Sequence, residues 1–159
     1  MKDQKVQAPS ILSVIFLSWF YTGKMPKAPG TFGSLATLPL IYLLSYLDFN
    51  IYSLIALIIV LWVLAVIITE NIQKKFHLHD PQWIVIDEVI GMLITWAFTL
   101  RTDLTMLGLV FISFRIFDIV KIWPASYFDR LHHGIGTITD DVISGVYAGL
   151  ITYFASRFI

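Results

Sequence analysis

Long uncharged stretches separated by short charged segments divide this sequence. The clearest stretch lies between Asp48 and Glu70, where FNIYSLIALIIVLWVLAVIIT runs for 21 residues without a charge. At about 1.5 Å per residue, a helix of this length measures roughly 31 Å, which matches the hydrocarbon thickness of a bilayer. Residues 51–69 are therefore predicted to form a helix that crosses a membrane.

Other apolar stretches predict further helices. Their expected crossings are residues 28–47, 84–100, 104–120 and 141–158. The second and third extend the uncharged runs 89–100 and 104–114 through neighbouring charged residues, because neither run is long enough to span alone. The shorter stretch Ile11–Tyr21 is predicted to form either a helix at the membrane interface or a re-entrant helix, which enters and leaves the membrane on the same side. Gly145 and Gly149 have the spacing that lets two membrane helices approach closely, although chance explains one such pair equally well.

These patterns favour helices over strands, because the apolar runs exceed strand length and lack an alternation of period two. The expected fold is all-α: a small polytopic membrane bundle of about four to six helices, in a single domain over residues 1–159. Composition agrees, since 57% of the residues are apolar and only 14% are charged, against about a quarter charged in soluble domains. A net charge of zero gives no electrostatic support for nucleic-acid binding. The absence of cysteine excludes disulfides, thiolate metal sites and cysteine nucleophiles.

The loops between the five crossings divide the charged residues unequally. One side carries nine of the eleven basic residues, and only Arg101 and Arg157 lie opposite. The positive-inside rule makes the richer side cytoplasmic. Nine of the eleven acidic residues fall on that side too, which leaves only Asp48 and Asp103 opposite. A site built from carboxylates would therefore face the cytoplasm.

Carboxylates beside or within apolar helices are expensive and usually functional. Here they are Asp80, Asp87, Glu88, Asp118, Asp129, Asp140 and Asp141. The pair Asp87–Glu88 is the most distinctive, because WIVI and VIGMLI flank it and no structural use for two charges is evident there. Carboxylates that converge from several helices suit Mg²⁺, which prefers oxygen ligands. A substrate phosphate would complete the coordination of the ion. Arg115, Asp118 and Lys121 recur every three residues along one helix face, where cations would contact that phosphate.

Each acidic position also has a purely structural interpretation. Asp140 or Asp141 could cap the last helix, and Asp118 could neutralise Arg115 or Lys121. Asp80 precedes a proline and could form a turn. The adjacent Asp129 and Arg130 could be a solvated loop pair.

Four sequence blocks, read together, carry a family resemblance. They are KMPKAPGTFGS, IVIDEVIGM, FRIFDIVKIWPASYFD and HGIGTITDDVISGV. In order and spacing they resemble the phosphatidylglycerophosphatase A family from about residue 20 to about residue 150. The resemblance implies an all-helical, Mg²⁺-dependent integral membrane phosphatase that converts phosphatidylglycerophosphate to phosphatidylglycerol and phosphate. The family's acidic motifs fall on all seven carboxylates named above, its basic positions on Arg115 and Lys121, and its APGT turn on residues 28–31.

The resemblance and the residue patterns together assign expected roles. The expected Mg²⁺ ligands are Asp80, Asp87, Glu88, Asp140 and Asp141. The expected catalytic residues are Asp87, Glu88, Asp118 and Asp141, with Asp118 as a further ligand or the base. The residues expected to bind the substrate phosphate are Arg115, Lys121, Lys24, Lys27 and Thr31.

The expected location is the inner (cytoplasmic) membrane, with several crossings, a phospholipid substrate and a site that faces the cytoplasm. The alternative function is a small cation-coupled membrane carrier that uses buried carboxylates. A carrier of that kind would spread its acids through the membrane and repeat a pattern of broken helices. Neither feature is visible in the sequence. The residue pattern makes no prediction of the oligomeric state.

Overall fold

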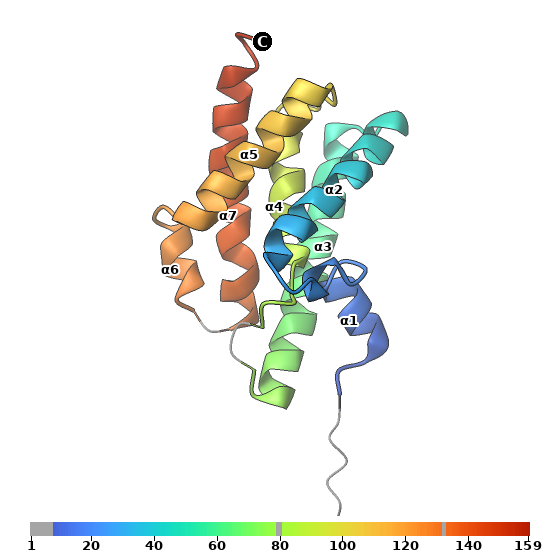
Figure 1. Cartoon of the computed structure of the whole chain (residues 1–159), viewed down its shortest axis with the longest axis vertical. Helices are drawn as coiled ribbons and strands as arrows, with labels where there is room; N and C mark the ends of the chain where they lie inside the picture. Colours follow the sequence, from blue (N-terminus) through green and yellow to red (C-terminus); the bar gives the residue numbers. More distant parts are fainter. Residues whose placement is uncertain (1–7, 79–80, 132) are drawn as a thin grey trace, which may run out of the picture.

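The computed structural model describes residues 8–78, 81–131 and 133–159, which form helices and no strand. The all-α prediction is therefore confirmed for these residues (Figure 1). The described residues form seven α-helices, more than the expected four to six, and two of them, α1 and α6, are short. The elements are α1 (Ile11–Leu17), the 3₁₀ helix η1 (Thr22–Lys24), α2 (Pro29–Tyr46), α3 (Ile51–Phe76), α4 (Ile86–Ala97), α5 (Leu104–Val120), α6 (Ala125–Asp129) and α7 (Gly134–Ala155).

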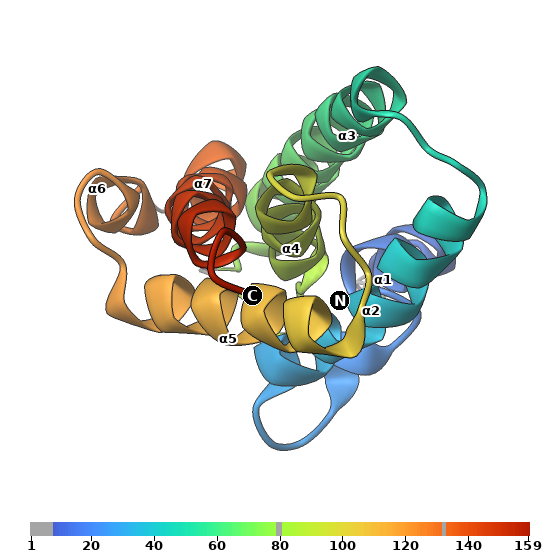
Figure 2. The ribbon, with the colours of Figure 1, turned by 90° about the horizontal axis from the view of Figure 1, so that it is seen from above.

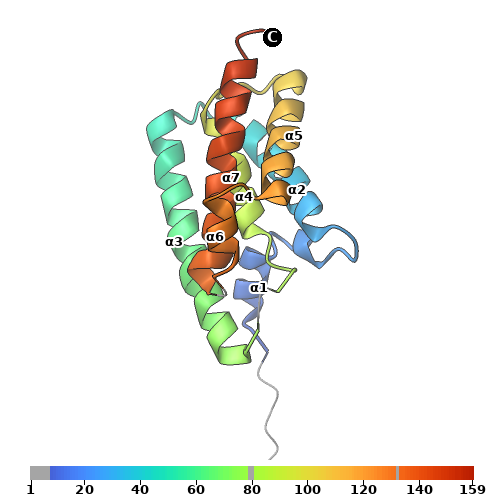
Figure 3. The ribbon, with the colours of Figure 1, turned by 90° about the vertical axis from the view of Figure 1, so that its left-hand side faces the viewer.

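The short helix α4 lies at the centre of the bundle. Seen from above, it is surrounded by α7, α3, α2 and α5 (Figure 2). Eight of its twelve residues are buried, and Trp96 packs with Leu54 of α3 and Phe114 of α5 in one apolar core. Helix α3 runs along the length of the molecule beside α7 (Figure 3).

Glycines bring α4 and α7 into backbone contact. A Cβ atom on Gly145 would lie 2.6 Å from the carbonyl oxygen of Gly91, closer than real side chains approach. On the other helix, a Cβ atom on Gly91 would lie 2.8 Å from the carbonyl oxygen of Asp141. Gly149 similarly faces the ring of Phe98. The spacing of Gly145 and Gly149 therefore serves close packing between two helices, one of the two interpretations that the sequence left open.

Of the five predicted crossings, the structure supports one. Among the described residues, only α3 is both long enough and apolar enough to cross a membrane. Helix α4 has 12 residues rather than the predicted 17, so it measures only about 18 Å. It ends at Ala97 because Leu100 turns into the left-handed region, with a φ of 53°. A multi-pass bundle is therefore not confirmed.

The first apolar stretch is too short to span, as expected. Its helix α1 has seven residues and ends where Trp19, Phe20 and Tyr21 all adopt positive φ. The chain then turns back toward the centre, and the backbone N–H of Val85 donates to the carbonyl oxygen of Leu17 at 2.8 Å. This bond ties the first helix to the segment that leads into α4.

Candidate functional site

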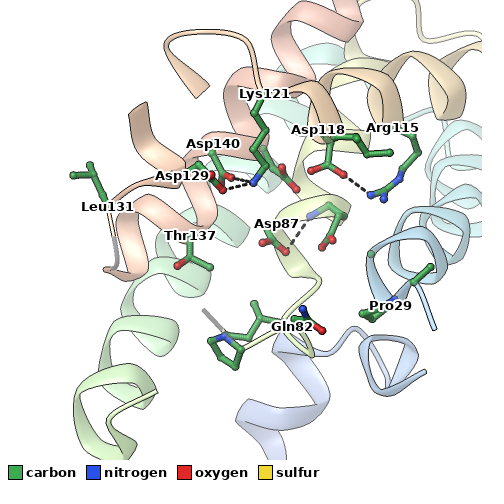
Figure 4. Close-up of a pocket in the computed structure, with 17 residues that line it drawn as sticks. Pro29, Gln82, Asp87, Arg115, Asp118, Lys121, Asp129, Leu131, Thr137 and Asp140 are labelled. Atoms are coloured by element: carbon green, nitrogen blue, oxygen red, sulfur yellow. Dashed lines mark hydrogen bonds and ion pairs between the residues drawn. The ribbon is translucent and has the colours of Figure 1, made fainter. Parts of the chain in front are cut away.

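A polar cavity of about 460 Å³ lies where the first turns of α2, α4 and α7 meet the end of α5 and α6 (Figure 4). Six carboxylates and two cations line it. Its walls are Ala28, Pro29, Gly30, Pro81, Gln82, Ile84, Asp87, Glu88, Arg115, Asp118, Ile119, Lys121, Asp129, Leu131, Thr137, Asp140 and Asp141.

The first turn of α4 contributes Asp87 and Glu88. Helix α4 begins at Ile86, so both acids lie where the partial positive charge of the helix favours a carboxylate. The backbone N–H of Glu88 donates to Oδ1 of Asp87 at 3.2 Å. The charged pair that interrupts the apolar sequence thus lies at the point where the central helix meets the cavity.

Helix α7 contributes the second acidic pair. Asp140 and Asp141 are each only 3% exposed. The interpretation of either residue as a helix cap is wrong, because α7 begins six residues earlier, at Gly134. The contact between Gly91 and Asp141 instead places these acids beside the first turns of α4.

The two helices bring Asp87, Glu88 and Asp141 together. One carboxylate oxygen from each lies within 4.8 Å of the other two. Three buried carboxylate oxygens here have no hydrogen-bond partner within the described residues. Two belong to this group, Oε2 of Glu88 and Oδ1 of Asp141, and the third is Oδ1 of the adjacent Asp140. Buried carboxylate oxygens without a partner are costly. Because a divalent cation with oxygen preference would satisfy them and offset their repulsion, the donor set fits Mg²⁺. Asp80, a fifth expected ligand, lies outside the described residues.

The basic side chains of Arg115 and Lys121, both predicted to bind phosphate, pair with carboxylates at the cavity wall. Arg115 donates from Nη1 to Oδ2 of Asp118. Lys121, just beyond the end of α5, donates from Nζ to both Asp129 and Asp140. Asp129 thus pairs with Lys121, which corrects its interpretation as part of a solvated pair with Arg130. Asp118 does neutralise Arg115, and it also faces the cavity.

Burial and the neighbouring charges shift the pKa values of Lys121 and Asp140 in opposite directions. Burial alone would lower the pKa of Lys121, but Asp140 and Asp129 outweigh it and raise the pKa above its usual value. Burial raises the pKa of Asp140 to about 6, against the opposing effect of the Lys121 ammonium. Lys121 is therefore a permanent positive charge at neutral pH.

The first turn of α2 closes the cavity at Gly30. A Cβ atom there would overlap Oε1 of Glu88 and lie 3.2 Å from Nη1 of Arg115. The absence of a side chain thus lets the carboxylate and the guanidinium lie against the backbone of α2. Sequence reasoning placed Gly30 in the APGT turn but gave it no role. An uncharged residue carries no signal of this kind without coordinates.

Three residues expected to bind phosphate are absent from the described wall of the cavity. Lys24, Lys27 and Thr31 do not line it. The ammonium of Lys24 instead lies 5.1 Å from the ring centre of Tyr21. Thr137 and Gln82 line the cavity without having been predicted, since a lone threonine or glutamine gives no signal in a sequence.

Comparisons with known proteins point to one family. The family model described as phosphatidylglycerophosphatase A matches residues 15–156. A phosphatidylglycerophosphatase A from Escherichia coli is 38% identical over 92 residues, which cover 57% of this chain and 54% of the relative. The protein of that name from Haemophilus influenzae is 36% identical over 77 residues, which cover 48% and 47%.

The chain spans about half the length of these curated relatives, and no solved structure matches it. The family match nevertheless extends from within α1 to the end of α7, and it includes all six carboxylates that line the cavity. The chain therefore belongs to the phosphatidylglycerophosphatase A family.

Proposed function

We propose that this chain is a Mg²⁺-dependent lipid phosphatase that hydrolyses phosphatidylglycerophosphate to phosphatidylglycerol and phosphate. One observation carries the proposal: in a chain of this family, Asp87, Glu88 and Asp141 present carboxylate oxygens within 4.8 Å of one another. Arg115 and Lys121 line the same cavity. A site with clustered acids and adjacent cations suits a ligand that carries both a metal ion and a phosphate.

Asp87, Glu88 and Asp141 would hold the ion, with Asp140 beside them. When bound, Mg²⁺ supplies Lewis-acid polarisation of the phosphoryl oxygens. Arg115 and Lys121 would orient the terminal phosphate and offset charge on its oxygens as the phosphoryl group transfers. Asp118 would hold the Arg115 guanidinium in place and accept a proton from the attacking water. The water oxygen forms a bond to phosphorus as the bond from phosphorus to the glycerol oxygen breaks, and the leaving alcohol takes up the proton that Asp118 accepted.

The surface supports a location in the membrane. Large apolar side chains are exposed on the outer faces of four helices, among them Tyr42 of α2, Ile59 of α3, Ile112 of α5 and Ile151 of α7. The cavity is lined from the first turns of α2, α4 and α7 and the end of α5. The opposite ends of α5 and α7 lie together at the top of Figure 1, and Arg101 and Arg157 line a second pocket beside them. We infer that the bundle crosses the inner membrane several times, with the cavity at the cytoplasmic boundary. The carrier alternative lacks support, because the buried acids gather around one cavity instead of spreading through the bundle.

The activity is tested with purified protein in detergent micelles that contain phosphatidylglycerophosphate. We expect Mg²⁺-dependent release of inorganic phosphate, its loss on addition of EDTA, and its recovery when Mg²⁺ or Mn²⁺ is restored. A control assay measures hydrolysis of the phosphodiester in phosphatidylglycerol, which should not occur. An absence of phosphate release, alongside an active reference enzyme in the same micelles, would refute the proposal.

The orientation is tested separately, and the lack of native cysteine makes this simple. Single cysteines at two exposed positions would report on opposite ends: Leu104, the first residue of α5 and 88% exposed, and Lys75, exposed near the end of α3. In intact cells, a membrane-impermeant maleimide should label Leu104→Cys from the outside, and Lys75→Cys only after the cells are opened. The reverse labelling would overturn the orientation.

A further inference from the structure

The first turn of α7 receives its cap from another helix. The N-cap residue His133 makes no side-chain hydrogen bond to this turn within the described part of the chain. The backbone N–H of Gly134 instead donates to Oε2 of Glu70, on α3, at 2.6 Å. A helix start needs such acceptors, and a negative charge there is favoured by the helix dipole. Glu70 therefore does for α7, from a position 64 residues away, what an N-cap side chain does locally.

The two helices are in backbone contact at the same place. A Cβ atom on Gly134 would lie 2.6 Å from the backbone nitrogen of Glu70 and 2.8 Å from the carbonyl oxygen of Val66. A second side-chain bond joins the two antiparallel helices nearby, where Nε2 of Gln73 on α3 donates to Oγ1 of Thr137 on α7 at 3.1 Å (Figure 3). Two bonds between different residue pairs of α3 and α7 define the register of α7 against α3 more strictly than either bond alone.

The register of α7 decides where its acids lie. Thr137 lines the cavity, and Asp140 and Asp141 follow within about one turn. A slip of one residue along an α-helix moves a side chain by about 1.5 Å and turns it by about 100°. Such a slip would separate Asp141 from Asp87 and Glu88, whose oxygens now lie within 4.8 Å of it.

We propose that Glu70 and Gln73 are positioning residues, which hold α7 in the register that brings Asp141 to the metal-binding carboxylates. They reach neither substrate nor metal, and neither residue lines the cavity. This inference rests on the proposed function for its activity readout, but its metal-binding readout does not require turnover.

The central test compares three variants of the full-length protein. Glu70→Ala removes the acceptor, whereas Glu70→Gln keeps an oxygen that accepts the same hydrogen bond. Lys74→Ala is the matched control, because this side chain is 73% exposed and pairs with Glu70 at 3.0 Å without touching α7 in the described contacts. Each protein is measured for Mn²⁺ affinity by electron paramagnetic resonance, and for kcat and KM with phosphatidylglycerophosphate.

For Glu70→Ala, we expect Mn²⁺ affinity and kcat each to fall roughly ten-fold. This is the lower end of the losses found when a residue that orients a metal ligand is replaced. The KM for the lipid should stay unchanged, because the lipid contacts are intact. Glu70→Gln and Lys74→Ala should match the wild type in all three quantities. The proposal is overturned if Glu70→Ala behaves as the wild type, if only its thermal stability falls, or if Glu70→Gln is as impaired as Glu70→Ala.

If Glu70→Ala does not fold, Gln73→Met decides the question. This substitution keeps the side-chain volume, removes the bond to Thr137 and removes a buried amide oxygen that has no partner among the described residues. A fall in Mn²⁺ affinity with an unchanged melting temperature supports the inference, and unchanged Mn²⁺ affinity contradicts it. Wild-type protein that binds Mn²⁺ but releases no phosphate would refute the proposed function alone.

Discussion

Gly30 offers a sharp test of how the cavity is built. In Gly30→Ala, the new Cβ atom would overlap Oε1 of Glu88 and lie 3.2 Å from Nη1 of Arg115. To restore an ordinary contact of roughly 3.5 Å, the Glu88 carboxylate must move by about 1 Å. A misplacement of about 1 Å in a catalytic group can cost about 100-fold in rate. We therefore expect kcat/KM for phosphatidylglycerophosphate to fall about 100-fold, equivalent to about 2.7 kcal/mol in the activation free energy.

Gly108→Ala is the matched control, since nothing lies within 4 Å of a Cβ atom at this position on α5. Both substitutions replace glycine by alanine within a helix, which by itself favours the fold by about 1 kcal/mol. Gly108→Ala should therefore keep full activity and raise the melting temperature by roughly 2–4 °C. Phosphate release and thermal melting are measured for both variants in the same detergent. If Gly30→Ala retains activity within about three-fold, the position of Glu88 is not critical and the reasoning from transition-state geometry fails.

Two further predictions concern charged residues. Asp87→Asn and Asp141→Asn should each abolish phosphate release without loss of membrane insertion. Arg101→Gln, at the far end of the bundle, should leave activity unchanged, and its inactivation would show that the opposite end matters. Because the pKa of Lys121 is raised, its pairing with Asp140 stabilises the fold below the usual lysine pKa, and this stabilisation is lost only as the pH rises through the raised value. Lys121→Met also removes the ammonium that opposes the raised pKa of Asp140, so this pKa rises further and ionising the buried carboxylate becomes more costly. The variant should therefore melt below the wild type by an amount that grows as the pH rises between about pH 7 and 9, whereas a difference that is absent or shrinks with rising pH would contradict the assignment.

The predictions that succeeded depend on local sequence. The uncharged run before Glu70 predicted α3, because the length and apolar composition of a segment can be read without knowledge of its tertiary contacts. The pair Asp87–Glu88 was singled out for a similar reason, since two charges between apolar segments are costly. The structure places both residues at the cavity, and their catalytic and metal-binding roles stay predictions. Both inferences use only the composition around a residue.

The predictions that failed depend on where helices begin and end. Asp140 and Asp141 resemble caps in sequence, but α7 begins at Gly134 because Glu70 of α3 supplies the first acceptor. The predicted crossing 84–100 contains a helix of only 12 residues. A charge pattern cannot reveal either boundary, because each is decided by backbone conformation or by a partner distant in the chain.

Hydrophobic pattern and charge placement were thus sufficient to predict helices, one segment long and apolar enough to cross a membrane, and a set of acids of which six line one cavity. Tertiary packing alone selected Asp87, Glu88 and Asp141 as the group that converges, because Gly91 and Gly145 allow α4 and α7 to touch. It also paired Lys121 with Asp129 and left Lys24 outside the cavity wall described here. Distances between side chains on different helices depend on packing that no single segment encodes, and these distances define the site.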